Sequence, residues 1–314
     1  MKNEIVTVIG ATGFVGRHTV RALAKAGWRI RAASRHPAMG FFLRPMGQVG
    51  QIELVKCDVT NPDSVAAAVN GADAVVNLTG ILFEKGQSFA DVQADGAAHV
   101  AGAAAAAQIS RFVHVSAIGA DSQSDSAYAR TKAEGEQAVR AAVPDAVILR
   151  PSIIFGPDDG FFNRFAAMAR LFPALPLIGG GKTRFQPVFV GDVAAAIATA
   201  LEDGAPARGH VFELGGPAIY SFHELMALIL KETGRKRALV SLPFGIAMLQ
   251  ASFLQLLPRP VLTRDQVRLL KKDNVATPPG LDELGITPTS VEAVVPSYLW
   301  RYRPKGEYRD PAAA

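Results

Sequence analysis

The chain has 314 residues, a formal net charge of +5, and 49% apolar against 19% charged residues. This length and composition exclude a disordered chain and allow a large buried core. No run of basic residues marks a nucleic-acid tract, so we expect no nucleic-acid partner. The single cysteine, Cys57, excludes an internal disulfide, indicates a reducing compartment and is expected to be buried. The first apolar run begins almost at Met1, so we expect no leader peptide.

The chain opens on a predicted strand, a glycine-rich turn and a helix. Residues 5–9 are apolar and rich in β-branched side chains, and a helical pattern covers 15–26. Between them stands Gly10-Ala11-Thr12-Gly13-Phe14-Val15-Gly16, in which three glycines recur every third residue. Glycines permit a tight turn, a close approach of backbone to pyrophosphate, and close packing of helix on strand. Because a helix N-terminus also attracts anions, the motif predicts a dinucleotide phosphate site, with a plain strand-to-helix turn as the alternative.

Strands and helices then alternate up to residue 150. Further strands are predicted at 28–34, 52–57, 74–78, 111–115 and 146–150, and further helices at 63–69, 89–108 and 127–142. The alternation predicts right-handed crossovers, and the almost wholly apolar strands predict burial on both faces. The fold class is therefore α/β, with a doubly wound parallel Rossmann sheet.

Prolines and a glycine run at 179–181 change the pattern after residue 150. Helices are predicted at 161–171, 193–202 and 222–233, with returns to the sheet near 186–190 and 210–214. We therefore predict a Rossmann domain over 1–155, with returns near 185–215, and a smaller, mostly helical C-terminal lobe over 156–314.

The segment Ala238–Pro258 carries no charge and is rich in Leu, Phe, Ile and Met. Prolines, serines and glutamines interrupt it, so a membrane-spanning helix, which needs ~20 apolar residues, is rejected. Two readings stay open for a helix beginning near Phe244. It packs into the core of the second lobe, or it exposes an apolar face to a membrane surface or a partner, where the flanking arginines and lysine at 235–237 suit anionic headgroups.

The end of the second strand bears on the choice of cofactor. NAD sites place an acidic residue about 20 residues past the glycines, on the ribose 2′-hydroxyl. Here Ser34-Arg35 stands at that point, and no Asp or Glu occurs between Gly16 and Glu53. A guanidinium binds phosphate well, and Arg17 follows the last glycine, so we predict NADP(H) over NAD(H). The alternative is that Arg35 is a solvated loop residue.

Later strand ends supply further candidates for binding and catalysis. Asp58-Val59 is placed to hold the adenine, and Asn77-Leu78-Thr79-Gly80 to line the nicotinamide half, with loop or capping roles as the alternatives. Ser116 ends the fifth strand, and Tyr128 and Lys132 lie one helical turn apart on one face. A neighbouring Lys⁺ lowers the pKa of a tyrosine from ~10, and a serine hydroxyl polarises a carbonyl. The three residues suit hydride transfer to or from a carbonyl.

These motifs resemble those of the short-chain dehydrogenase/reductase superfamily, in its extended or atypical branch. The similarity runs in order through the glycine motif, Asp58, Asn77-x-x-Gly80, Ser116, Tyr128-x-x-x-Lys132, Arg150-Pro151-Ser152 and the residues 189–194. It implies that Pro151 and Ile153 also line the cofactor. One position departs from the extended-branch pattern, because Gln93 stands where an Asn is usual, which puts a proton relay in doubt.

A narrower resemblance, carried by residues 155–156, 161–163, 262–267, 279–286 and 298–303, is to the NADPH-binding accessory subunits of respiratory complex I. That resemblance implies tightly held NADPH in a structural role, complex I partners near the quinone site, and, for a bacterial member, a peripheral place on the cytoplasmic side of the inner membrane. The alternatives are an active NADP(H)-dependent reductase or epimerase on a hydrophobic carbonyl or quinone-like substrate, and a redox sensor that docks a partner. The six histidines have no metal-ligand spacing, so no metal is expected.

Overall fold

A computed structural model describes residues 2–202, 207–258, 260–304 and 306. The chain divides into two compact units, which are described separately below. Unit 1 comprises Met1–Pro151, Gly191–Leu214 and Thr277–Thr287, and unit 2 comprises Ser152–Val190, Gly215–Ala276 and Pro288–Ala314.

Unit 1 is a Rossmann-type sheet of seven parallel strands, in the order β11-β6-β5-β4-β1-β2-β3. Its elements are β1 (Ile5–Ile9), α1 (Phe14–Lys25), β2 (Arg29–Ser34), the 3-10 helix η1 (Pro37–Met46), β3 (Ile52–Lys56), α2 (Pro62–Val69), β4 (Ala74–Asn77), the π-helical turn η2 (Ala90–Asp95), α3 (Gly96–Ala106), β5 (Arg111–Val115), α4 (Ala127–Ala142), β6 (Val147–Pro151), α6 (Val190–Ala200), β11 (Val211–Leu214) and α10 (Gly280–Glu283). The predicted fold class is confirmed.

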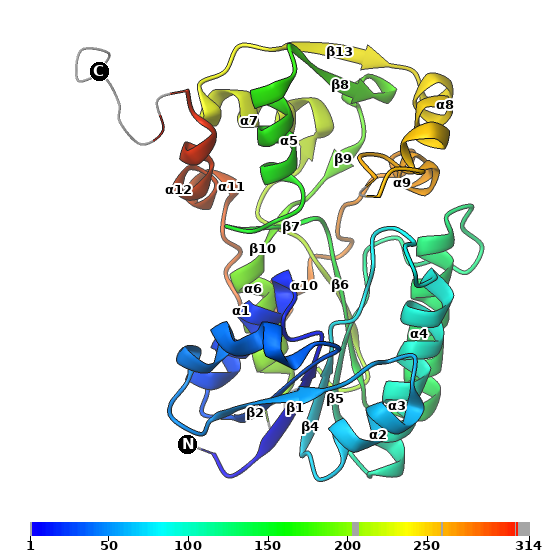
Figure 1. Ribbon diagram of the computed structural model, residues 1–314, viewed down its shortest axis with the longest axis vertical. Helices are drawn as coiled ribbons and strands as arrows, with labels where there is room; N and C mark the ends of the chain where they lie inside the picture. The colour runs from blue at the N-terminus through cyan, green and yellow to red at the C-terminus, as the bar shows by residue number, and fades with distance from the viewer. Residues whose placement is uncertain (1, 203–206, 259, 305, 307–314) are drawn as a thin grey trace. The chain divides into compact units, whose positions relative to one another are not determined.

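Helices cover both faces of this sheet. Figure 1 shows α2, α3 and α4 on one face and α1 and α6 on the other. On the first face, Val69, Val100 and Val139 of the helices pack against Val75 and Phe112 of the strands. Burial of both faces explains why the strands read as apolar runs in the sequence.

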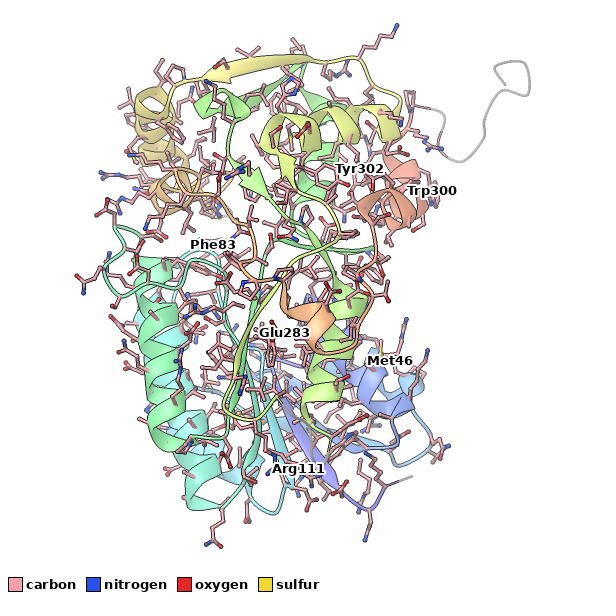
Figure 2. All side chains as sticks on the ribbon, turned by 180° about the vertical axis from the view of Figure 1, so that it is seen from behind. Met46, Phe83, Arg111, Glu283, Trp300 and Tyr302 are labelled. Atoms are coloured by element: carbon pink, nitrogen blue, oxygen red, sulfur yellow. The ribbon has the colours of Figure 1, made fainter. Side chains whose placement is uncertain are left out.

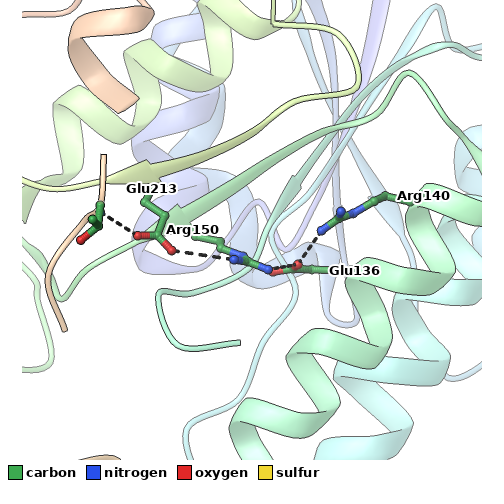
Figure 3. Close-up of polar contacts among 5 residues, drawn as sticks. Glu136, Arg140, Arg150 and Glu213 are labelled. Carbon is green, nitrogen blue, oxygen red and sulfur yellow. Dashed lines mark hydrogen bonds and ion pairs between the residues drawn. The ribbon is translucent and has the colours of Figure 1, made fainter. Parts of the chain in front are cut away.

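A buried carboxylate ties α4 to the two strands at one edge of the sheet. Glu136 is 2% exposed, and it accepts hydrogen bonds from Arg150 Nε (2.8 Å) and Nη2 (2.6 Å) and from Arg140 Nη2 (3.1 Å). Arg150 lies 3.7 Å from Glu213 of β11, which accepts from the backbone N–H of Thr277 at 2.9 Å. Figure 3 shows this chain of contacts. Bidentate pairing of this kind offsets the desolvation of a buried carboxylate.

Unit 2 is built from short two-stranded sheets and helices around a phenylalanine-rich core. Its elements are β7 (Ile154–Phe155), α5 (Phe162–Leu171), β8 (Ala174–Ile178), the 3-10 turn η3 (Gly179–Gly181), β9 (Arg184–Phe185), β10 (Val188–Phe189), β12 (Tyr220–Ser221), α7 (Phe222–Thr233), β13 (Ala238–Leu242), α8 (Phe244–Leu254), α9 (Arg264–Leu269), α11 (Val291–Val294), α12 (Pro296–Leu299) and the 3-10 turn η4 (Trp300–Tyr302). Phe155, Phe162, Phe185 and Phe222 form the centre of the core, and ring edges of Phe162 and Phe155 meet at a centroid distance of 5.9 Å.

One expectation about the large sheet is wrong. Residues 186–190 do not return to it, because β10 pairs with β7 in a separate sheet of unit 2. Of the two predicted returns, only β11 joins the large sheet, as the edge strand beside β6. The predicted helix over 89–108 is helical from residue 89 to residue 106, with the π-helical turn η2 as its first part and α-helix from Gly96 onward. The backbone angles at Phe89 and Gly96 are both α-helical, so the chain passes from the π-turn into the α-helix without a break.

The helix predicted near Phe244 is α8, and several of its large side chains are exposed, whereas Phe244 and Met248 pack inward. Ala247 and Ala251 are buried, whereas Ile246, Leu249 and Phe253 are 50%, 63% and 68% exposed. Its buried side packs on a small cluster that includes Val267 of α9. Within the described residues, no helix is long and apolar enough to cross a bilayer.

The contact between α4 and η2 generates a stability test. A Cβ at Gly135 would lie 2.2 Å from the carbonyl oxygen of Gln93, whereas a Cβ at Gly102 of α3 meets nothing within 4 Å. Gly135→Ala should therefore lower stability by about 1–3 kcal/mol, as overpacking does. Gly102→Ala should raise it by about 0.5–1 kcal/mol, because Ala is the better helix former. Urea unfolding midpoints of the two variants measure the difference, and equal midpoints would contradict the close contact.

Candidate functional site

The glycine-rich turn has the geometry of a phosphate cradle. Gly10 has φ +85°, and a Cβ at Gly16 would lie 2.3 Å from the carbonyl oxygen of Gly10 and 2.6 Å from that of Ala11. Neither position tolerates a side chain, so α1 starts directly against the end of β1. Gly13 is the N-cap of α1, and no side chain caps the helix. The N-terminus of α1, at Phe14 and Val15, is thus left to a ligand, as anion sites at helix N-termini require.

Arg35 is exposed just past β2, where the sequence placed the 2′-phosphate. Its Nη1 donates a hydrogen bond to Oε1 of Gln87, which lies in the loop after β4. The preceding Ser34 is 8% exposed, and its Oγ has no hydrogen-bond partner among the described residues. Arg17 stacks its guanidinium over the ring of Phe42 at 5.2 Å.

Asp58 makes hydrogen bonds to a neighbouring residue, and Val59 is buried. Asp58 Oδ1 accepts from Thr60 Oγ1 at 2.8 Å and from Thr60 N at 3.1 Å, and Val59 is buried in the core below α3. Asp58 also lines a pocket of about 360 Å³, together with Thr60, Gly86, Gln87, Asp91, Asp95 and His99. Carboxylate acceptors suit hydroxyl and amino groups, so this lining fits a ribose or an adenine, while the guanidinium of Arg35 fits a phosphate.

Lys132 lies buried between the carboxyl ends of two strands. It is 4% exposed, and its Nζ donates to the carbonyl oxygens of Val115 (3.1 Å) and Thr79 (3.4 Å). A Cβ at Gly80 would lie 3.3 Å from that Nζ. Burial lowers the pKa of Lys132 to about 8, against the opposing effect of Glu136. The structure thus brings Thr79, Gly80 and Lys132 together at the edge of the sheet where ligands of this fold bind.

Asn77 and His114 hold the turn that receives Lys132. Asn77 Oδ1 accepts from Thr79 N (3.1 Å) and Thr79 Oγ1 (2.6 Å), and its Nδ2 lies 3.3 Å from His114 Nδ1. Because Asn77 donates here, His114 Nδ1 is an acceptor and the proton sits on Nε2. Burial first, and Lys132 second, lower the pKa of His114 to about 3, which keeps the ring neutral.

Ser116, Tyr128 and Gln93 complete the site. Ser116 is 4% exposed, and its Oγ has no hydrogen-bond partner within the part of the chain that the structure describes. Tyr128 lies one turn before Lys132 on α4, and its ring packs edge-on against Phe89 at 5.9 Å. Gln93 is 1% exposed in η2, and its Nε2 donates to the carbonyl oxygen of Ile81 at 3.4 Å. Its Oε1, like Ser116 Oγ, has no partner in the described residues. Buried polar atoms normally have a hydrogen-bond partner, so Ser116 and Gln93 are the candidates here for contact with a ligand or water.

Pro151 and Ile153 fall in different units. Pro151 ends β6 in unit 1. Ile153 belongs to unit 2, packs against its phenylalanine-rich core, and donates its backbone N–H to Asn274 Oδ1 at 3.1 Å.

The structure also describes the surroundings of Cys57 and the arrangement of potential metal ligands. Cys57 is 2% exposed at the end of β3, and burial raises the pKa of its thiol to about 11, which leaves it inert. Among the residues that the structure describes, no three His, Cys, Asp or Glu side chains form a metal-binding group.

Sequence reasoning did not single out Gln87 or His114. Gln87 sits in a polar loop with no motif, and only the tertiary structure brings it to Arg35. His114 carried a weak signal, because a histidine in an otherwise apolar strand two residues before Ser116 needs a buried partner.

Comparison with known proteins places this site in a family. The model of the NAD dependent epimerase/dehydratase family matches residues 6–215. The chain is 35% identical to the Arabidopsis thaliana "NADH dehydrogenase [ubiquinone] 1 alpha subcomplex subunit 9, mitochondrial", over 96% of this chain and 79% of that protein. It is 36% identical to the mouse (Mus musculus) protein of the same name, over 95% and 80%.

A reductase and a solved structure are also similar. The chain is 36% identical to the "Ceramide reductase" of Caulobacter vibrioides, over 76% of this chain and 74% of that protein. The NADPH-dependent quinone oxidoreductase QOR2 of Escherichia coli has the same fold, with a TM-score of 0.74, 21% identity, and coverage of 94% of this chain and 99% of that one. The phosphate cradle, the buried Lys132 and these matches agree, and the chain belongs to the NAD dependent epimerase/dehydratase family.

Proposed function

We propose that this protein is an NADPH-binding accessory subunit of respiratory complex I, in which the cofactor stabilises the fold and the assembly. The observation that carries the proposal is the 35–36% identity, over 95–96% of the chain, to proteins named as subunits of NADH dehydrogenase. Both units of the chain are covered by these matches, including α8 and the C-terminal helices.

The charge around the site supports NADPH as the nucleotide. Arg35 and Arg17 supply positive charge where an NAD site has a carboxylate, and no Asp or Glu occurs between Gly16 and Glu53. The diphosphate would lie on Gly10–Gly16, and Lys132 would hold the nicotinamide ribose. Bound NADPH supplies a hydride donor, whose use depends on whether a substrate reaches Ser116 and Tyr128.

The exposed face of α8 supports a peripheral place at the membrane. Ile246, Leu249 and Phe253 present apolar side chains, and a basic cluster at 235–237 precedes the segment. The strand β13 lies between this basic cluster and α8, so the contact with a lipid surface would rest on the apolar face of α8 itself. For a bacterial protein, we infer a peripheral position on the cytoplasmic side of the inner membrane, near the quinone-binding region of the complex.

An active NADP(H)-dependent reductase is the second candidate. Two observations favour it. Ser116 Oγ has no hydrogen-bond partner among the residues that the structure describes, while Tyr128 and Lys132 share one helical face, and the chain is 36% identical to a protein named ceramide reductase. In that case Ser116 would polarise a hydrophobic carbonyl and Tyr128 would deliver the proton, with its pKa lowered by Lys132.

The nucleotide that accompanies the purified protein decides between the two. We expect stoichiometric NADPH that survives dialysis and is not oxidised by added quinones or long-chain carbonyl compounds. The nucleotide is released by denaturation and identified by chromatography. An empty or freely exchanging site, together with turnover of a carbonyl substrate, would support the reductase.

Arg35→Glu tests the 2′-phosphate assignment. The substitution removes a phosphate partner and adds a repelling charge, so the affinity for NADPH should fall by about tenfold or more, as loss of a charge-assisted hydrogen bond implies. The affinity for NADH should change much less. Titration by nucleotide fluorescence measures both constants, with Lys25→Glu on the same unit as a charge-matched control. Equal losses for the two nucleotides would contradict the assignment.

Tyr128→Phe and Lys132→Met separate holding the cofactor from using it. Tyr128→Phe removes only the phenolic proton, so cofactor retention and incorporation into complex I should match the wild-type protein. Lys132→Met removes the ammonium between β4 and β5, so NADPH should wash out. Bound nucleotide per protein and a native gel of solubilised membranes are the measurements. A reductase activity abolished by Tyr128→Phe would favour the second candidate.

The α8 face is tested with Leu249→Ser combined with Phe253→Ser. Both side chains are exposed, so the fold should survive and NADPH retention should be unchanged, while sedimentation with anionic vesicles should fall several-fold. Val49→Ser, at an exposed apolar position of unit 1, is the control. Loss of bound NADPH in the α8 variant would show instead that this segment belongs to the core.

A further inference from the structure

The segment that links β2 to β3 is firmly anchored on its inner side. Gly40 of η1 is buried so closely that a Cβ would lie 3.2 Å from side-chain carbons of both Leu54 and Thr12, and Leu43 is fully buried. Gln51 then closes the segment, because its Nε2 donates to the carbonyl oxygens of Ala24 (2.8 Å) and Trp28 (2.9 Å). The backbone of η1 is therefore fixed without help from its outer side chains.

The outer side of η1 exposes large apolar side chains. Met39, Phe41 and Phe42 are 72%, 56% and 41% exposed, and Val49 beyond them is fully exposed. Figure 2 labels Met46, the last residue of η1, which locates this segment at the margin of unit 1. Apolar residues clustered on a rigid segment that does not need them for its own packing mark an interaction surface.

Arginines stack on these aromatic rings. The guanidinium of Arg44 lies 5.0 Å from the ring centre of Phe41, and that of Arg17 lies 5.2 Å from the ring centre of Phe42. The sequence between Gly16 and Glu53 holds seven Lys and Arg and no Asp or Glu. The stacked arginines are held in place and can pair bidentately with carboxylates. Met, aromatic and Arg side chains are also the residues enriched in protein interfaces.

This surface is continuous with the proposed nucleotide site. Arg17 directly follows the glycine motif, and Gly40 packs against Thr12 of the same turn. Only one residue separates Arg35 from the start of η1. A nucleotide bound at the turn would hold Arg17 and η1 in this arrangement, so that a partner meets a preformed surface.

We propose that Met39, Phe41, Phe42 and Arg44 form a docking surface for a protein face that carries carboxylates around an apolar hollow, and that bound NADPH reinforces the surface through Arg17. The inference rests on the proposed function, under which the partner is a neighbouring subunit of the complex. A protein is favoured over lipid because Met, aromatic and Arg side chains together are the types enriched in protein interfaces, and the two guanidinium groups are already stacked on the rings of Phe41 and Phe42.

The test uses the full chain expressed in source cells that lack their own copy. Phe41→Ser combined with Arg44→Glu should lower the fraction of the protein that migrates with complex I on a native gel about tenfold, while NADPH retention stays at the wild-type level. Lys25→Glu, a charge reversal at an exposed site of α1, should incorporate normally. A photoreactive amino acid at position 39 should cross-link to an acidic segment of a complex I subunit, identified by mass spectrometry.

Three results would overturn the inference. Wild-type incorporation of the double variant would show that η1 is not an interface. Cross-linking of position 39 to lipid, with loss of binding to phosphatidylglycerol vesicles in the double variant, would assign the surface to a membrane. A wild-type protein that never migrates with complex I would overturn the proposed function as well, which distinguishes its failure from failure of the docking surface alone.

Discussion

The site depends on the burial of one ammonium group. Lys132 sits where β4 and β5 end, and its Nζ donates to the backbone carbonyl oxygens of Val115 and Thr79. Burial lowers its pKa to about 8 from an ordinary 10.5. Between these values the unfolded chain binds the proton and the folded chain does not, so stability rises with pH across this window, and at neutral pH the charged group lowers it. Under the proposed function, a nucleotide bound beside Lys132 would stabilise the folded state by mass action and offset this penalty.

The close contacts around Lys132 restrict the side chains and hydrogen bonds of the residues next to it. Gly80 faces the Nζ, and the Asn77–Thr79 hydrogen bonds shape the turn that offers it a carbonyl. His114 supports Asn77 from the adjacent strand while staying neutral. One turn further along the same side of α4, Gly135 packs closely on η2 and Glu136 binds Arg150. The helix that carries Tyr128 and Lys132 is thus held by both apolar contact and a buried ion pair, as a precise site requires.

The same arrangement serves either a structural cofactor or a reaction. Under the proposed function, holding NADPH would use the glycine-rich turn, the arginines and Lys132, whereas turnover would also require substrate access to Ser116 and Tyr128. Gln93 stands at the position where the extended branch usually has Asn, and its Oε1 is buried without a partner in the described residues. The similarity to both complex I subunits and a reductase fits a site in which holding and turnover are separable.

Local patterns in the sequence determined the fold class and most of the site. The glycine motif, the apolar strands and the spacing of Tyr128 and Lys132 are patterns within a few neighbouring residues. They therefore predicted the glycine-rich turn and the common helical face of Tyr128 and Lys132 without any long-range contact. Arg35 was recognised from the missing acid at the end of β2. Tertiary structure decided what depends on contacts far along the chain. It brings Arg35 to Gln87 and Asn77 to His114, and it pairs strand β10 with strand β7. It also leaves large residues of α8 exposed, which the sequence could not predict. The helix is apolar on all sides, so only tertiary packing decides which side is buried.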